Sequence, residues 1–101
     1  MDLTPYAAAR LRRREGPLRL GYLGPLGRAD GVHLLLEAFA GLEPGVATLV
    51  LHGDTEERSH LRRLRARAGE LGVDWGGPYR AEDTARLLAE LDVRVLPALW
   101  D

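Results

Sequence analysis

Short apolar runs alternate with segments of helical periodicity along most of this chain, and this alternation limits the possible folds more than any other feature. The apolar runs that predict strands cover residues 18–23, 47–52, 73–75 and 93–96. The segments between them, 32–40, 56–71 and 84–91, carry apolar residues at helical spacing. Such alternation is typical of a parallel sheet with right-handed crossover helices.

The predicted fold class is therefore α/β, a three-layer Rossmann-like sandwich around a parallel sheet. The run 47–52 is apolar on both faces, which is typical of a parallel strand with helices on either side. We expect a partial sheet of about four strands in the order third, second, first, fourth. In that order residues 93–96 form a bare apolar edge, so we expect a homodimer joined there.

Composition limits the partners that the chain can have. The 101 residues, 46% of them hydrophobic, suffice for one domain, which we divide into an N-terminal leader (1–17) and a partial Rossmann-like domain (18–101). A net charge of -1 gives no field that would attract nucleic acid. No apolar run reaches the roughly 20 residues of a membrane span. The absence of cysteine suits a reducing compartment, and we expect a cytoplasmic protein.

An arginine cluster precedes the first predicted strand. It consists of Arg10, Arg12, Arg13 and Arg14, and no aromatic residue is interleaved with it for base stacking. We therefore favour a solvated leader over a nucleic-acid-binding arm.

Five segments in order resemble a known family. They are LGYLG at 20–24, GVHLLLEAF at 31–39, LVLHGD at 49–54, WGGPY at 75–79 and LDVRVLPALW at 91–100. Together they resemble the C-terminal domain of the two-domain, retaining GT-B glycosyltransferases of family four, also called glycosyl transferases group 1. The resemblance extends from about residue 2 to residue 101, and its strength lies in the order and separation of the five segments.

The resemblance implies that this domain binds a nucleotide-diphosphate sugar, with UDP, GDP or ADP as the nucleotide, while a separate N-terminal domain binds the acceptor. By this analogy the loop 24–31 and the following helix hold the diphosphate through backbone N–H groups, which makes Gly24 and Arg28 candidate site residues. No cofactor beyond the donor is expected.

Further candidates follow the second, third and fourth strands. Gly53 and Asp54 stand where a ligand approaches, although Gly-Asp is also a common turn. Tyr79 and Arg80 stand where the family holds the nucleotide base. Trp100 either closes the donor pocket, as in a full enzyme, or forms an exposed apolar surface.

The loop 24–31 departs from the family pattern at two positions. The family has an arginine after the first glycine and a lysine before the last, and both contact the diphosphate. Here these positions hold Pro25 and Asp30. A carboxylate repels phosphate, so we expect Asp30 to act as a helix N-cap, with Arg28 as the residue that would compensate.

In the family, a proline loop like residues 97–100 is followed by two glutamates separated by seven residues, and in this sequence their expected positions lie beyond residue 101. We therefore assign no catalytic residue and expect the isolated chain to be inactive, while its parent protein is a glycosyltransferase. The alternative is a non-catalytic Rossmann-like module that acts by association. A receiver-like fold is disfavoured because no acidic cluster follows the first strand.

The three histidines are not spaced as metal ligands, and no metal site is expected. His52 ends a strand that faces the expected cleft, where packing or a turn hydrogen bond is the favoured role. His60 is expected to be solvated.

Overall fold

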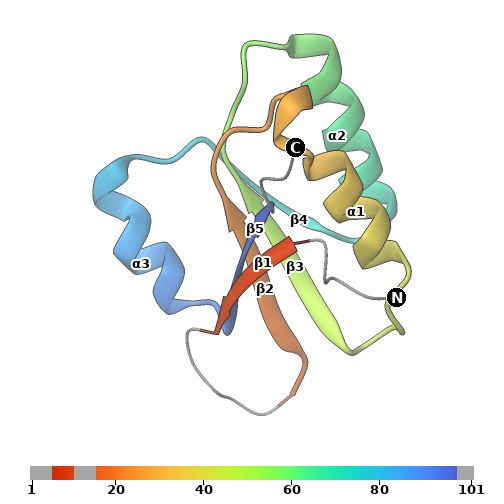
Figure 1. The fold of residues 1–101 in the computed structure, drawn as a ribbon, viewed down its shortest axis with the longest axis vertical. Helices are drawn as coiled ribbons and strands as arrows, with labels where there is room; N and C mark the ends of the chain where they lie inside the picture. Colours follow the sequence, from red (N-terminus) through yellow and green to blue (C-terminus); the bar gives the residue numbers. More distant parts are fainter. Residues whose placement is uncertain (1–5, 11–15, 98–101) are drawn as a thin grey trace.

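The computed structural model describes residues 6–10 and 16–97. Two one-turn 3-10 helices, η1 (Arg28–Asp30) and η2 (Ala81–Asp83), precede α1 and α3. The other elements, in chain order, are β1 (Tyr6–Arg10), β2 (Leu18–Leu23), α1 (Val32–Ala40), β3 (Ala47–His52), α2 (Arg58–Glu70), β4 (Asp74–Gly77), α3 (Thr84–Ala89) and β5 (Val93–Pro97) (Figure 1).

The strands form one sheet in the order β1-β5-β2-β3-β4. Strands β2, β3, β4 and β5 run parallel, and Leu20 of β2 lies beside Leu49 of β3 and Val93 of β5. Among these four parallel strands the order is the predicted one, third, second, first, fourth, so the predicted Rossmann-like α/β fold is confirmed.

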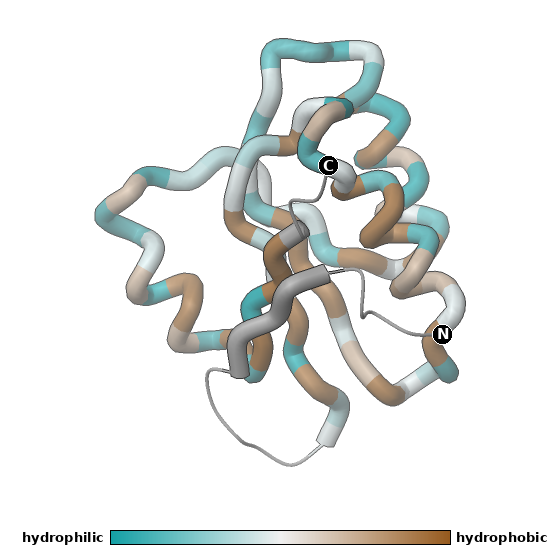
Figure 2. The backbone as a smooth tube through the Cα atoms, in the orientation of Figure 1, coloured by the Kyte–Doolittle hydropathy of each residue, from teal (hydrophilic) through white to brown (hydrophobic). Residues whose placement is uncertain are grey.

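Helices cover both faces of the sheet. Helices α1 and α2 lie on one face and α3 lies on the other (Figure 1). The larger core lies under α1 and α2, where Leu35, Leu36 and Leu51 are fully buried. The smaller core lies under α3 and contains Leu87 and Leu91. The brown segments of Figure 2 follow these two cores.

The expectation of a bare edge at residues 93–96 is wrong. Strand β1 pairs antiparallel with β5, with Tyr6 beside Pro97 and Arg10 beside Val93. A strand of the same chain thus fills the position at which we expected a second copy to pair, and the homodimer loses its structural basis.

The strand β1 lies in the segment expected to be a leader. Its sequence, Tyr-Ala-Ala-Ala-Arg, has little intrinsic strand preference, because alanine is depleted in strands. The strand forms because the edge of β5 that faces away from β2 supplies backbone hydrogen-bonding groups with which β1 can pair. Of the arginine cluster, Arg10 ends β1, whereas Arg12, Arg13 and Arg14 lie outside the described residues.

A buried aspartate joins the α3–β5 junction to the start of β2. Asp92 is fully buried, and its carboxylate accepts a hydrogen bond from the Arg19 N–H at 2.8 Å. The Asp92 N–H in turn donates to the Arg19 carbonyl at 2.8 Å. This reciprocal pair fixes where β5 enters the sheet.

Within residues 6–10 and 16–97, no helix combines the length and the apolar character needed to cross a lipid bilayer.

Candidate functional site

The carboxyl ends of β2, β3 and β4 meet at one edge of the sheet, where their loops are joined by backbone hydrogen bonds. The Gly24 N–H donates to the His52 carbonyl at 3.0 Å, and the Gly53 N–H donates to the Gly77 carbonyl at 2.9 Å. In parallel α/β sheets this edge is where ligands bind. We call it the strand-end edge.

Gly53 lies directly against the loop that follows β2. Its φ is 149°, and a Cβ at this position would overlap the Gly24 carbonyl oxygen. Only glycine permits so close an approach of the two backbones. The contact therefore holds the loops after β2 and β3 together.

The carboxylate of Asp54 is held within its own loop. It accepts hydrogen bonds from the Thr55 N–H at 2.8 Å and from the Arg58 guanidinium at 3.3 Å. The Asp54 carbonyl accepts the Leu26 N–H at 3.0 Å. Asp54 thus makes the turn contacts that were one of its two expected roles.

The backbone donors expected to bind diphosphate are already bound by carboxylates of the protein. The Gly27 N–H donates to Asp30 at 2.9 Å, and the Arg28 N–H donates to Glu57 at 3.2 Å. Since a carboxylate resembles a phosphate oxygen in charge and acceptor strength, these two side chains occupy the positions that an anion would take.

The expected N-cap role of Asp30 is wrong. The N-cap of α1 is Gly31, which has a φ of 73°. Asp30 instead ends η1, and its carboxylate turns back to the Gly27 N–H. The single turn of η1 inserted before α1 moves the aspartate away from the cap position.

Tyr22, which the sequence analysis did not select, fixes the loop after β2. Its buried hydroxyl donates to the Pro25 carbonyl at 2.6 Å. Burial, together with the negative charge of Asp30, raises the pKa of the Tyr22 hydroxyl to about 12. The hydroxyl therefore remains a hydrogen-bond donor at neutral pH.

The segment after β4 brings Tyr79 against His52. The two rings meet edge to face with centroids 6.3 Å apart, and Tyr79 also packs on the smaller core. Burial lowers the pKa of His52, which favours the neutral form of its ring. The Arg80 N–H donates to the Asp83 carboxylate at 3.2 Å, and Trp100 lies outside the described residues.

A family model for glycosyl transferases group 1 matches residues 17–101. The chain belongs to that family. No curated protein matches this glycosyl transferase chain.

Solved structures agree with the family match. The chain is similar to Anabaena HepE in complex with UDP, with 29% identity and a TM-score of 0.62 over 75% of this chain and 22% of HepE. For HepE in complex with UDP and glucose the identity is 26% and the TM-score is 0.58, over 72% of this chain and 21% of HepE. This chain thus spans about a fifth of the length of these structures.

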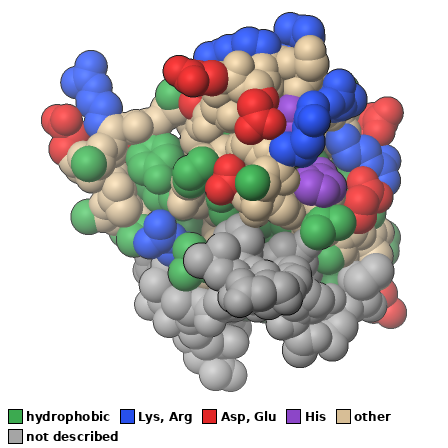
Figure 3. Space-filling model, turned by 45° about the horizontal axis from the view of Figure 1, so that its top comes forward, with side chains coloured by type: hydrophobic (Ala, Val, Ile, Leu, Met, Phe, Trp, Pro, Cys, Tyr) green, Lys and Arg blue, Asp and Glu red, His purple; other side chains and the backbone are tan. Residues whose placement is uncertain are grey.

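Arg28 lines a groove between α1 and α2, with a volume of ≈ 350 Å³ and a floor that includes Leu36 and Leu64. His33 and Arg63 line the same groove. Figure 3 shows histidine and arginine side chains gathered on this side of the molecule.

His60 is buried, contrary to the expectation that it is solvated. Only 6% of the residue is exposed, and its ring meets that of His33 edge to face at 5.7 Å. Burial, followed by the proximity of His33, lowers the pKa of His60, while Glu57 acts in the opposite direction. Arg28 and Arg63 also disfavour its charged form.

We expect His60 to make the fold less stable in mild acid. Because its pKa is lowered on folding, the unfolded chain binds a proton more readily, so stability falls as the pH drops below the ordinary histidine value of about 6.5. Urea unfolding at about pH 7.5 and about pH 5.5 measures this loss, which His60→Leu should reduce. Equal losses in the wild type and the variant would contradict the assignment.

Across the part of the chain that the structure describes, no three histidine or carboxylate side chains gather closely enough to hold a metal ion.

Proposed function

We propose that this chain binds the nucleoside diphosphate part of a sugar nucleotide at the strand-end edge, as the donor-binding portion of a retaining glycosyltransferase. The observation that carries the proposal is that both similar HepE structures contain UDP. The ends of β2, β3 and β4 form the edge at which α/β sheets bind nucleotides, which supports the same location. UDP is therefore the first ligand to test, ahead of GDP and ADP.

The candidate residues take different roles in this proposal. Gly24 and Gly53 bring the backbone close to the ligand, and Asp54 borders it. Half-buried Tyr79 offers a ring for the base, beside the exposed Arg80. Trp100 is proposed to close the pocket.

The diphosphate meets an unfavourable local field in this site. Asp30 and Glu57 already accept the N–H groups of Gly27 and Arg28, and both carry negative charge near the expected phosphate position. We therefore expect affinity for UDP to be lower than in relatives whose loop donors are free.

Sugar transfer is proposed for the parent protein and not for these 101 residues alone. In the family that the sequence resembles, a separate domain holds the acceptor and the reaction takes place between the two domains. The alternative of a non-catalytic association module rested on a bare edge at β5, which β1 covers.

A titration of the 15N-labelled chain with UDP, GDP and ADP, followed by amide chemical shifts, tests the proposal. We expect UDP to shift the signals of Gly24, Gly53 and Tyr79 while those at the opposite end of the sheet stay unchanged. A folded protein whose spectrum is unchanged by all three nucleotides would refute nucleotide binding.

Asp30→Asn should strengthen UDP binding. The amide keeps an oxygen acceptor for the Gly27 N–H and removes a negative charge, which is worth on the order of 1 kcal/mol, or about fivefold in affinity. Asp74→Asn makes the same chemical change at the start of β4, at the opposite end of that strand, and should leave affinity unchanged. Equal effects of the two variants would show that Asp30 does not face the diphosphate.

A further inference from the structure

Arg94 occupies the position in the sheet where the strand order reverses. From β2 the chain continues through β3 and β4 on one side, then crosses through α3 to β5 on the other side of β2. In register, Arg94 of β5 lies beside Gly21 of β2 and Ala9 of β1, two of the smallest residues. Open α/β sheets bind ligands in the crevice at such a reversal point.

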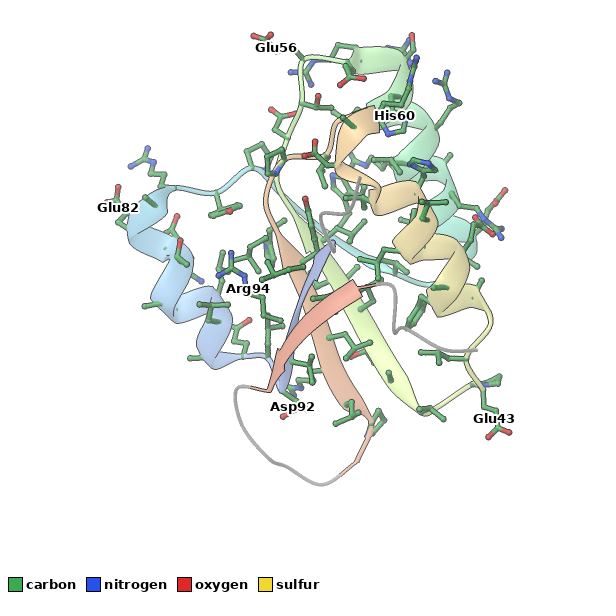
Figure 4. All side chains as sticks on the ribbon, in the orientation of Figure 1. Glu43, Glu56, His60, Glu82, Asp92 and Arg94 are labelled. Atoms are coloured by element: carbon green, nitrogen blue, oxygen red, sulfur yellow. The ribbon has the colours of Figure 1, made fainter. Side chains whose placement is uncertain are left out.

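The guanidinium of Arg94 makes few hydrogen bonds to the described residues. Within the described residues its guanidinium makes one hydrogen bond, from Nη2 to the Leu23 carbonyl at 3.4 Å, and its Nε is buried without a hydrogen-bond partner there. Figure 4 shows the side chain directed into the space between α3 and the sheet. Arg94 is half-buried, and a partly buried cation that lacks a carboxylate partner among the described residues favours an anionic ligand.

Arg94 lies close enough to the strand-end edge to act on groups there. Its contact with the Leu23 carbonyl places the guanidinium at the last residue of β2, directly before Gly24. Burial is the main cause that raises the pKa of the Tyr22 hydroxyl, Asp30 and Tyr79 raise it further, and the positive charge of Arg94 acts in the opposite direction. Arg94 therefore lies near enough to the same hydroxyl as Asp30 and Tyr79 to act on its charge.

We propose that Arg94 is the cation that binds a phosphate of the nucleoside diphosphate in this chain. The inference rests on the proposed function and adds a residue to it. The two cations that the family resemblance leads one to expect are replaced by Pro25 and Asp30, and Arg28 lines the α1–α2 groove. A guanidinium supplies several N–H donors in one plane, which suits phosphate oxygens.

The test compares UDP with uridine, which lacks the phosphates. We expect the wild-type chain to bind UDP at least about ten times more tightly than uridine, and Arg94→Gln to reduce this ratio to about threefold or less. Arg94→Lys, which keeps the charge but loses the planar donors, should give an intermediate ratio. Arg62→Gln, an identical change at an exposed residue of α2, should keep the wild-type ratio.

A second measurement uses the wild-type chain alone, so it does not depend on whether a variant folds. In the 15N-labelled wild type, the Nε–H signal of Arg94 should shift on addition of UDP and stay in place with uridine. A signal that is unchanged at saturating UDP would overturn the role of Arg94.

The two hypotheses fail in different ways. Bound UDP with an unchanged UDP-to-uridine ratio in Arg94→Gln would reject Arg94 as the phosphate ligand and leave the proposed function intact. A folded wild type that binds neither UDP nor uridine would reject nucleotide binding itself, and the role of Arg94 with it.

Discussion

Gly53→Ala is expected to lower the free energy of unfolding by about 3 kcal/mol or more. The new methyl group would overlap the Gly24 carbonyl oxygen and also press on Leu26, whose Cγ lies 3.3 Å from the Cβ position. The φ of 149° at this residue is itself unfavourable for any side chain. Relief requires the loops after β2 and β3 to separate, which would break the bond from the Gly24 N–H to the His52 carbonyl.

Two matched glycine variants separate the causes of this loss, with urea unfolding followed by circular dichroism as the measurement. Gly45→Ala tests positive φ alone, because φ is 87° and nothing lies near its Cβ position; it should cost about 1 kcal/mol. Gly69→Ala, in open space on α2, should stabilise the protein by about 0.5–1 kcal/mol. If Gly53→Ala costs no more than Gly45→Ala, the close approach of the loops does not limit stability.

Leu26→Ala is expected to cost about 2–5 kcal/mol, the range for removing a fully buried leucine side chain. Leu26 is 0% exposed although it lies in the loop between β2 and α1. Its side chain fills the space beneath Gly53 and belongs to the larger core. The loop is therefore part of the packed structure.

Leu34→Ala is the matched control, because Leu34 lies on α1 and is 50% exposed. Its truncation should change the free energy of unfolding by about 0.5 kcal/mol or less. Similar losses in the two variants would mean that Leu26 does not anchor the loop.

The regular elements could be predicted because their burial is encoded locally. The run 47–52 is apolar on both faces, and it forms the strand β3 between two helical layers. The spacing of Val32, Leu35 and Leu36 predicted the buried face of α1, and all three are fully buried. Periodicity reports which side of an element is covered, and this suffices for fold class and strand order.

The errors concern features that depend on distant partners. Strand β1 forms because β5 offers an edge for pairing. The alanine-rich sequence of β1 does not by itself predict a strand. His60 is buried where α1 packs against α2 and its ring meets that of His33, although arginines flank it in the sequence.

From the sequence, a position for the candidate site could be proposed, but not the contacts within it. The glycine loop and the strand ends were visible in the sequence, whereas the carboxylate of Glu57, which accepts a hydrogen bond from Arg28, comes from a separate loop. Arg94 escaped notice because an arginine within an apolar strand gives no indication of the direction of its side chain. Only the register with Gly21 and the contact with Leu23 reveal it.

The pairing of β1 with β5 has a consequence for how the chain acquires its fold. Almost the whole sequence separates Tyr6 from Pro97, its partner across the sheet. Contacts between such distant positions close a large loop and slow the folding reaction. During synthesis β1 is made early but can pair only after β5 has been made. The parallel strands can therefore associate before β1 pairs with the edge of β5.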